Sequence, residues 1–455
     1  MPLIKNFGRN VQFTPAQLYE PRNDEEVLEI LRQHRGGKIR CIGSGHSWSG
    51  ILVTGGVLLD LRHFDAVDVA ERRPEPLVRL GAGCTIGRAL KLLKAQGLTL
   101  PTVGAIKEQT IAGAISTGTH GSGAPSLSHF VEEMRIATFD PGTGDPAIIR
   151  LRGRSSLLAA RCSLGFFGVV LDVMLRAVAA YRVKERFEKA TLQEILGGAG
   201  EWPLQQFVLI PWKWRYMVYR RQTTDERETW VHVALMRLQL LLLMDALQHW
   251  LLKFVLLRVP RIARPGLIRF FFRRLLCLPA HRRVDDSDRV LTLRHDLFRH
   301  VEMEVFIPER ELEAADRSIR RLLKLAAGKA RARTAKPRGH FPGLRGCWTH
   351  HYPISFRYVR PDETLVSMAS SDGRGKEQTW IAISFFTYLP IDAAFRTFAA
   401  AVAKWLVKRH GARLHWGKYF PIPFREAVKS YRHFADFEVI CRRYDPAGVF
   451  WNENL

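Results

Sequence analysis

The protein has 455 residues and a formal net charge of +25, from 69 basic and 44 acidic side chains. Hydrophobic residues make up 47% of the chain and charged residues 25%, a globular composition that argues against a disordered, collagen-like or polytopic membrane protein. The length predicts two or three domains, each with its own hydrophobic core. The basic excess suits nucleic acid, an anionic membrane surface, or an anionic substrate or cofactor, and composition does not choose among them.

The cysteines and the N-terminus bear on the compartment. The six cysteines are Cys41, Cys84, Cys162, Cys277, Cys347 and Cys441. They form no Cys-x-x-Cys pair or zinc-ligand pattern, so we expect neither a disulfide scaffold nor a metal site. The N-terminus reaches a charge at Lys5 and lacks the apolar stretch of a secretory signal. We therefore expect a cytoplasmic protein, with peripheral attachment to the cytoplasmic membrane face as an alternative.

The opening third of the chain is expected to alternate helices with short strands. Acidic residues before a helical spacing of apolar residues predict a helix over 24–31. Short apolar runs predict strands over 38–42, 57–61, 77–80 and 168–175. A further helix is expected over 86–96, where Gly97 ends it. The rest of the chain mixes helical and strand patterns without an internal repeat, which predicts an α+β fold.

Two stretches, 43–49 and 111–123, hold more glycine than packing requires. Glycine lets backbone N–H groups converge on a phosphate, and interspersed hydroxyls add donors, so both stretches suit a pyrophosphate. A structural turn is the alternative for each. Neither has the P-loop pattern, and Gly43-x-Gly45 lacks the third glycine of the dinucleotide fingerprint, which disfavours a P-loop nucleotidase or a classical dehydrogenase. His46, inside the first stretch, is either a hydrogen-bonding residue or a nucleophile.

Two other stretches concentrate the positive charge, since 251–280 holds seven cations, 321–350 holds eight, and neither holds an acid. An apolar run over 231–257 is interrupted by Arg237, Asp245 and Lys253, so we expect no membrane-spanning helix. The pattern over 231–280 fits either an element that docks on an anionic membrane surface or core helices with a basic rim. An exposed loop is expected over 329–339. Nucleic-acid-binding signatures are missing, and we expect no nucleic-acid partner.

Eight short motifs follow one another from residue 6 to the C-terminus. They are Asn6–Gly8, Gly43–Ser47, Leu59–Leu61, Gly81–Gly83, Thr110–Gly123, Ser163–Val170, His415–Lys418 and Asp445–Asn452. Their order resembles that of the FAD-linked oxidases of the vanillyl-alcohol oxidase type, and among these the aldonolactone and alditol oxidases, such as D-arabinono-1,4-lactone oxidase. The resemblance lapses between about 190 and 290, which includes the apolar and basic stretch.

The resemblance implies an FAD-binding domain over 1–178, an α+β substrate or cap domain over 179–430, and a C-terminal segment over 431–455 that returns to the first domain. It also implies FAD, bonded covalently through His46 to the flavin C8α methyl. The cofactor-binding residues that it implies are Gly43, Ser44, Gly45, His46, Ser47, Ser116, Thr117, Gly118, Thr119, His120, Gly121, Ser122, Gly123, Gly168, Val170 and Lys418. The implied catalytic residues are Arg357, Lys418, Ser355 and His415, although His415 is alternatively a packing residue.

One position departs from the family pattern, because Ser355 stands where the family's Glu-x-Arg element has its glutamate, while Arg357 is retained. Serine is shorter, neutral and a poorer proton acceptor, so the substrate differs or another group compensates. Glu302 and Glu304, two apart on an expected strand, either supply that group or line a solvated face. Paired phenylalanines at 385 and 386 indicate a less polar pocket or simply core packing.

These observations predict an FAD-dependent oxidoreductase that moves a hydride from a hydroxylated carbon of a sugar, polyol or aldonolactone to flavin N5. Oxygen, or a quinone or cytochrome, would then accept the electrons. The alternative is a membrane-peripheral flavin dehydrogenase or reductase acting on a lipid-linked or amphipathic substrate. A binding protein without turnover is a third possibility.

Overall fold

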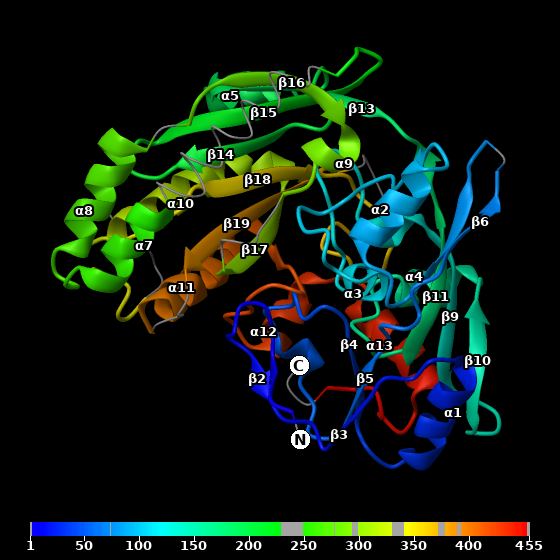
Figure 1. The fold of residues 1–455 in the computed structure, drawn as a ribbon. Coiled ribbons are helices and arrows are strands. Elements are labelled where there is room, and N and C mark those ends of the chain that lie inside the picture. Colours follow the sequence, from blue (N-terminus) through cyan, green and yellow to red (C-terminus); the bar gives the residue numbers. More distant parts are fainter. Residues whose placement is uncertain are drawn as a thin grey trace.

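The computed structural model describes residues 2–72, 74–228, 249–276, 278–293, 299–329, 341–371, 378–388 and 393–452. The N-terminal part of the chain builds two small sheets and covers them with short helices (Figure 1). The parallel sheet has the order β3 (Gln17–Tyr19), β5 (Val57–Asp60), β4 (Ile39–Ile42). The other sheet has the order β10 (Pro146–Leu151), β9 (Val131–Phe139), β11 (Val169–Arg176), β7 (Leu77–Gly81), β6 (Val67–Glu71). Two strand pairs complete this part: β1 (Ile4–Lys5) with β2 (Gln12–Phe13), and β8 (Leu98–Thr99) with β12 (Val178–Ala179).

The second part is built on an eight-stranded sheet, at the top and left of Figure 1. Its order is β16 (His281–Asp286), β13 (Arg182–Ala190), β15 (Arg215–Thr224), β14 (Gln206–Ile210), β18 (Ile354–Val359), β19 (Trp380–Tyr388), β17 (His300–Pro308), β20 (Arg413–Leu414). All of the adjacent strands pair antiparallel.

The helices include the two that the sequence predicted, over 24–31 and 86–96. In the first part they are α1 (Asp24–Gln33), α2 (Ile86–Lys94), α3 (Ile111–Ser116) and α4 (Arg154–Ala160). The second part contributes α5 (Leu192–Gly197), α7 (His249–Arg258), α8 (Arg264–Phe270), η4 (Phe271–Leu275), α9 (Ser287–Val290), α10 (Leu312–Ala326), α11 (Ala393–His410), α12 (Phe424–Ala427) and α13 (Phe434–Tyr444). Helix α1 begins where the Asn23 side chain accepts a hydrogen bond from the Glu26 amide, as an N-cap residue does.

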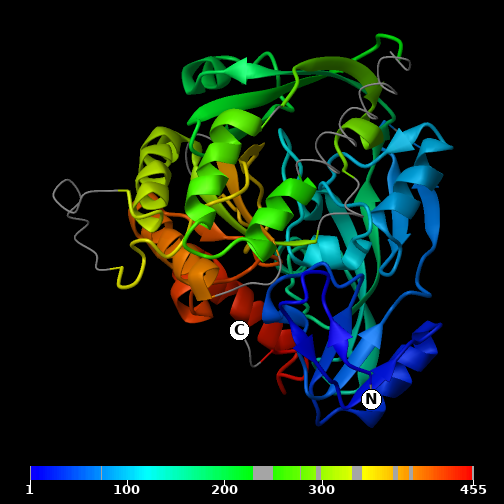
Figure 2. The ribbon, with the colours of Figure 1, turned by 60° about the vertical axis from the view of Figure 1, so that its left-hand side comes forward.

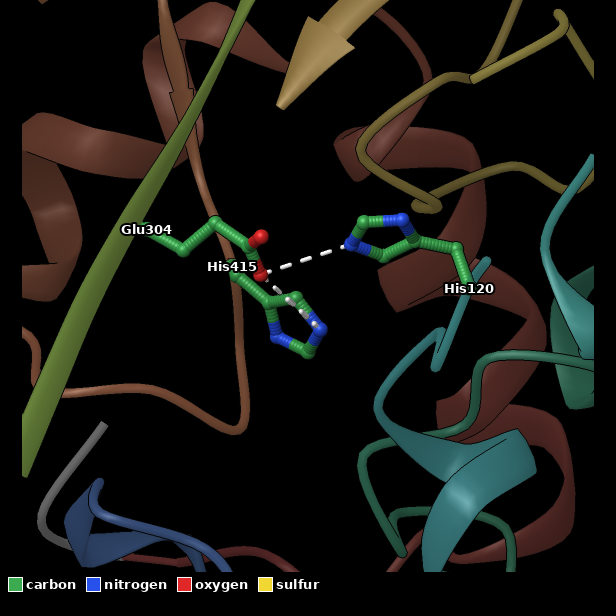
Figure 3. A group of neighbouring side chains, drawn as sticks. All are labelled: His120, Glu304 and His415. Atoms are coloured by element: carbon green, nitrogen blue, oxygen red, sulfur yellow. Dashed lines mark hydrogen bonds and ion pairs between the residues drawn. The ribbon is translucent and has the colours of Figure 1, made fainter. Parts of the chain in front are cut away.

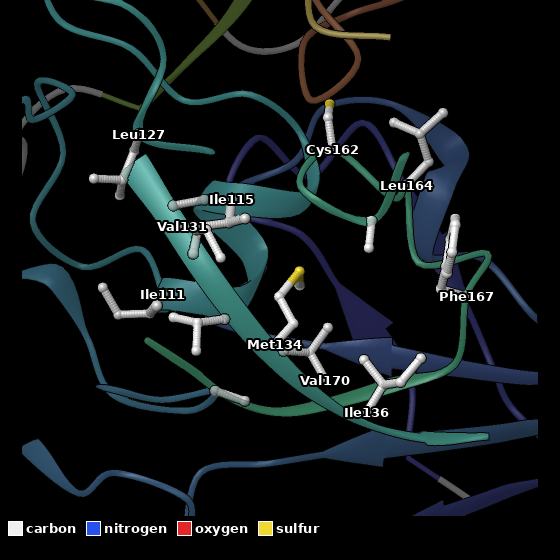
Figure 4. Close-up of a cluster of buried hydrophobic side chains, with 14 of the residues drawn as sticks. Ile111, Ile115, Leu127, Val131, Met134, Ile136, Cys162, Leu164, Phe167 and Val170 are labelled. Atoms are coloured by element: carbon white, nitrogen blue, oxygen red, sulfur yellow. The ribbon is translucent and has the colours of Figure 1, made fainter. Parts of the chain in front are cut away.

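Alternation along the strands gives the large sheet two different faces. Met303, Val305, Ile383, Phe385 and Phe356 belong to a core that also includes the buried sides of α10 and α11. The even-numbered neighbours on β17 and β19 and the odd-numbered ones on β18 turn to the opposite side, toward the N-terminal part. A separate core fills the N-terminal part, where Ile111, Ile115, Met134 and Ile136 pack together (Figure 4).

The C-terminal segment crosses back to the N-terminal part, and the red helix α13 lies close to β4 and β5 in both views (Figures 1 and 2). The buried Arg40 guanidinium donates to the Phe450 carbonyl at 2.5 Å and to the Ile51 carbonyl at 2.7 Å. The Asn452 side chain donates to the carbonyls of Gly50 and Ile51 at 2.9 and 2.8 Å. The C-terminal segment is therefore hydrogen-bonded to strand β4 and to the turn at Gly50, which lie on either side of the His46 loop.

The expected helices and strands of the opening third are confirmed, with boundaries that shift by at most two residues. The apolar run over 231–248, Cys277 and the expected loop over 330–339 lie outside the described residues. The other five cysteines are free thiols.

Candidate functional site

A cavity of about 510 Å³ lies between the N-terminal part and the face of the large sheet that carries Glu302, Glu304 and Arg357. One wall comes from the loops around His46, Thr110 and Thr119 and from the start of β11, and the other from β17, β18, β19 and the 415–418 turn. The cavity therefore brings both glycine stretches together with the residues predicted to be catalytic.

The backbone of the first glycine loop, 43–49, has at its two glycines a conformation and a packing that only small residues allow. Gly45 has a φ of +69°, and a Cβ at Gly43 would lie 2.1 Å from the Thr110 hydroxyl, so neither position takes a larger residue without strain. Within the described residues, the amide N–H groups of Ser44, Gly45, His46 and Ser47 donate no hydrogen bond. Unpaired amides that converge at a cavity suit an anion such as a pyrophosphate.

His46 lies in the cavity wall, with Nδ1 3.0 Å from the Ser44 hydroxyl and its ring stacked on Phe7 at a centroid distance of 5.0 Å. Burial is the main cause that lowers the pKa of His46. The imidazole is therefore neutral at neutral pH, as a nucleophile must be. Trp48, two residues on, holds the loop to the other wall, because its amide donates to the Gly417 carbonyl at 2.9 Å.

Only some of the residues predicted to bind the cofactor in the second glycine stretch line the cavity. Ser116, Thr117, Thr119 and His120 line the cavity, as do Gly168 and Val170 of the neighbouring segment. Gly118, Gly121, Ser122 and Gly123 do not. Two of them connect the two parts of the molecule instead: the Gly123 amide donates to the Tyr358 carbonyl at 2.7 Å, and the Ser122 hydroxyl accepts from the Tyr358 amide at 3.1 Å.

On the large sheet, Arg357 and Ser355 have different positions relative to the cavity. Arg357 lines it and has no ion-pair partner among the described residues. Ser355 is buried, is not part of the cavity wall, and accepts a hydrogen bond from the Gln206 side chain at 2.9 Å. Phe386 lines the cavity while Phe385 belongs to the core, so the phenylalanine pair serves both predicted purposes.

Glu302 and Glu304 are 5% and 1% exposed, so the expectation of a solvated face is wrong. Both line the cavity, since alternation on β17 turns them to the same side. The Glu302 carboxylate forms an ion pair with the Lys418 ammonium, which lies over the Trp48 ring at 4.7 Å. Lys418 is therefore held inside the site and is no surface lysine.

Glu304 lies between two histidines from distant parts of the chain (Figure 3). Its Oε2 is 3.4 Å from His120 Nε2 and 3.8 Å from His415 Nε2, and its Oε1 accepts from the Ser384 hydroxyl at 2.8 Å. Burial alone would raise the pKa of Glu304, but His120, Lys418 and His415 together hold it well below its usual value. Burial also keeps the pKa of His415 well below normal.

The donors around these histidines indicate where their protons lie. His415 Nδ1 accepts from the Gly417 amide at 3.0 Å, so the neutral ring carries its proton on Nε2 and presents it to Glu304. His120 Nδ1 faces the Gly121 carbonyl at 2.9 Å and must donate there. Although two histidines and a carboxylate within 4.8 Å resemble a cation site, the Nε2 proton of His415 suits a hydrogen-bonded cluster better than metal ligation.

Comparisons with known proteins agree with this arrangement. Residues 173–455 match the family model described as D-arabinono-1,4-lactone oxidase, and residues 15–143 match that of an FAD binding domain. A long-chain alcohol oxidase from an uncultured marine euryarchaeote is 39% identical to this chain, over 99% of it and 95% of that protein. An L-gulonolactone oxidase from Scyliorhinus torazame is 25% identical, over 99% of this chain and 97% of that protein.

The chain belongs to the D-arabinono-1,4-lactone oxidase family.

Membership in the D-arabinono-1,4-lactone oxidase family confirms the predicted enzyme class, an FAD-dependent oxidoreductase that acts on CH–OH groups of a small hydroxylated molecule. The fold agrees: a cholesterol oxidase from B. sterolicum superimposes with a TM-score of 0.77 at 13% identity, over 99% of this chain and 95% of that one. At this identity the likeness concerns the fold alone, and it confirms the α+β, vanillyl-alcohol oxidase-type prediction. In the described part of the chain, no helix has the length and hydropathy needed to cross a bilayer.

Sequence reasoning missed several residues of this family member's site. Arg40 lines the cavity, and burial lowers its pKa to about 10, while the carbonyls of Phe450 and Leu164 accept hydrogen bonds from its terminal N–H groups. Thr110 packs against Gly43. Tyr352, whose ring centroid is 5.3 Å from that of Phe386, and Leu293 also line the cavity. Single apolar or basic residues of this kind carry no local signal, because only long-range packing brings them to the cavity.

Proposed function

We propose that this enzyme oxidises the hydroxylated carbon of an alcohol that carries an apolar chain, and that oxygen reoxidises the cofactor. The observation that carries the proposal is the composition of the cavity wall on the large-sheet side. There Arg357, Glu302 and Lys418 line the cavity together with Phe386 and Tyr352, and Ser355 contributes no carboxylate. The relative at 39% identity is named a long-chain alcohol oxidase, which supports the same substrate class.

The residues present fit FAD. The unpaired amides of 44–47 would bind its pyrophosphate, and the neutral His46 would form the covalent bond to it. When bound, FAD supplies the acceptor for a hydride from the substrate carbon. The cations Arg357 and Lys418 stabilise negative charge that develops at that end of the cavity. The apolar wall excludes water and holds the chain of the substrate.

The substrate is tested with purified holoenzyme by measuring hydrogen peroxide formation from primary alcohols of increasing chain length. We expect kcat/KM to rise with each methylene that enters the apolar wall, by about 0.8 kcal/mol or roughly 4-fold per group. Replacing Phe386 by Asp should remove that dependence. A kcat/KM that is the same for ethanol and decanol would contradict the proposal, as would the absence of peroxide.

An aldonolactone is the second candidate, because the family model covering 173–455 carries the D-arabinono-1,4-lactone oxidase description. The polar groups Arg357 and Glu302 would serve its ring hydroxyls equally well. L-gulono-1,4-lactone in the same peroxide assay separates the two candidates. A kcat/KM for the lactone above that for every alcohol would favour this second function.

We also propose that the enzyme docks on an anionic membrane surface through a basic apolar patch over 250–275. Its exposed apolar residues are Trp250, Phe254, Leu257, Ile262, Leu267, Phe270 and Leu275. Seven cations and no acid accompany them between 249 and 276. The other side of these helices, including Leu252, Val255 and Ile268, is buried in the core of the second part. Exposed aromatic and aliphatic side chains among arginines suit the interface of an anionic bilayer.

Vesicle co-sedimentation tests the patch. Wild-type protein should sediment with vesicles that contain phosphatidylserine and stay in solution with pure phosphatidylcholine, and salt should weaken the binding. Ile262→Glu, at a side chain that is 93% exposed, should abolish binding without loss of activity on a soluble alcohol. Vesicle binding that persists in Ile262→Glu would contradict the proposal. If the wild type is oligomeric and Ile262→Glu is monomeric, the patch would instead be a contact between copies of this chain.

The domain boundaries predicted from the sequence are kept as a proposal: an FAD-binding domain over 1–178, a substrate domain over 179–430 and a returning segment over 431–455. Two observations support them. Strand β11 ends at Arg176 and the large sheet begins at Arg182, and the tail bonds to residues of the first part at Arg40 and Gly50.

A further inference from the structure

Among the described residues, three carboxylates line the cavity, from Asp60, Glu302 and Glu304. Because position 355 carries no carboxylate, their individual positions become important. Oxidation of a C–H bond next to a hydroxyl releases a hydride and a proton. Arginine and the ammonium of lysine hold no lone pair for that proton.

Of the histidines in the wall, His120 and His415 turn their Nε2 atoms to Glu304. His46 is the proposed site of the bond to FAD, and the His300 ring packs against Trp48 and Phe386. The acceptor is therefore sought among the carboxylates, in a site where Ser355 lies off the cavity.

Two of the three carboxylates are already fully engaged. Both oxygens of Glu304 are occupied, by Ser384 on one side and by His120 and His415 on the other. Asp60 accepts from the amide of Arg62 at 3.0 Å and from its guanidinium at 2.5 Å, next to the first glycine loop and far along the chain from the large sheet.

Glu302 has one oxygen left. Its Oε2 is bound to the Lys418 ammonium, and its Oε1 has no hydrogen-bond partner among the described residues. Backbone hydrogen bonds fix the strand of Glu302 against the 415–419 segment that carries Lys418. The Glu302 carbonyl accepts from the Tyr419 amide at 2.8 Å, and the Glu304 carbonyl accepts from the His415 amide at 3.0 Å. Glu302 lies opposite Phe386 in the β17–β19 register, at the same end of the cavity wall.

We propose that Glu302 is the catalytic residue that accepts the hydroxyl proton of the substrate, in place of a carboxylate at position 355. The substrate O–H bond breaks as its proton passes to Glu302 Oε1, and the C–H bond breaks as hydride passes to the cofactor, so the carbon loses two electrons and becomes a carbonyl. Oxygen would take up the two electrons by way of FAD, and the proton held on Glu302 would become one of the two in hydrogen peroxide. This assignment rests on the proposed alcohol oxidation.

The test is anaerobic bleaching of the flavin by decanol in Glu302→Gln, with Glu313→Gln on the exposed side of α10 as the matched control. Loss of a general base costs about 10²- to 10⁴-fold. We expect the bleaching rate of Glu302→Gln to fall by at least roughly 100-fold at unchanged flavin content, while the control keeps the wild-type rate. In Glu302→Ala, added formate should restore part of the rate because it supplies a carboxylate to the vacated position.

The outcomes separate this role from the proposed function. If neither alcohols nor lactones bleach the wild-type flavin, the proposed function is wrong. If decanol bleaches both wild type and Glu302→Gln at the same rate, only the role of Glu302 is overturned. Failure of Glu302→Gln to bind flavin moves the decision to Glu302→Ala, where a flavin-loaded variant that formate leaves unchanged contradicts the proposal.

Discussion

At His46, the hydrogen bond to Ser44 and the stack on Phe7 orient a neutral ring in the cavity wall. A ring so placed, with its pKa lowered by burial, is suited to bond covalently to the cofactor. Acid-precipitated wild-type protein should therefore stay yellow. His46→Ala should yield a colourless precipitate and a yellow supernatant, and Ser44→Ala should reduce the covalent fraction. Extraction of all the flavin from the wild type by acid would show that no such bond exists.

Arg357 reaches the cavity from β18 without a carboxylate partner among the described residues, so its charge is available to the bound molecules. A donor that is held in place where negative charge develops contributes about 10²- to 10³-fold in rate. We expect Arg357→Met to slow flavin reduction by about 100-fold at unchanged flavin content. Arg317→Met, at an exposed position of α10, is the control. An unaltered rate of flavin reduction in Arg357→Met would show that Arg357 does not stabilise the negative charge that develops in the reaction.

At the scale of single elements, strand β17 shows what a local pattern can and cannot predict. The two-residue spacing of Glu302 and Glu304 predicted that they share a face, and they do. It could not predict that this face is buried, because the N-terminal part and the 415–418 turn that cover it come from far along the chain. The same holds for Phe385 and Phe386, whose opposite directions follow from alternation but whose surroundings do not.

The outer strands of the large sheet are stabilised by a buried ion cluster. Glu185 on β13 accepts from Arg221 and Arg283, each at 2.6 Å. Burial alone would raise the pKa of Glu185, but Arg221, His281 and Arg283 hold it well below its usual value. A lowered pKa contributes stability that is complete above the unfolded value of about 4.3 and is lost as the pH falls.

Glu185→Gln should therefore lower the free energy of unfolding by about 3–5 kcal/mol at neutral pH, since two arginines lose their counterion. The difference from wild type should shrink below about pH 4. Urea unfolding followed by tryptophan fluorescence at the two pH values measures both quantities. A difference that is independent of pH would mean that the substitution disturbs packing and that the charge of Glu185 is unimportant.

For the whole molecule, local and long-range parts of the site differ in how far the sequence predicts them. Each glycine loop is contiguous, so its composition identified it, and the order of motifs identified the family. Long-range pairs such as His120 with Glu304, 184 residues apart, arise only when the large sheet closes over the loops. For the same reason Ser122 and Gly123, predicted to bind the cofactor, instead connect the two parts at Tyr358.

The central claim is that the cavity between the two parts brings a hydroxylated carbon to a bound flavin. The most direct measurement is the visible spectrum of the anaerobic holoenzyme after mixing with decanol, followed by admission of oxygen. We expect the flavin absorbance to bleach in the alcohol and to return with oxygen, with one hydrogen peroxide formed per flavin. A flavin spectrum unchanged by decanol, by shorter alcohols and by L-gulono-1,4-lactone would contradict it.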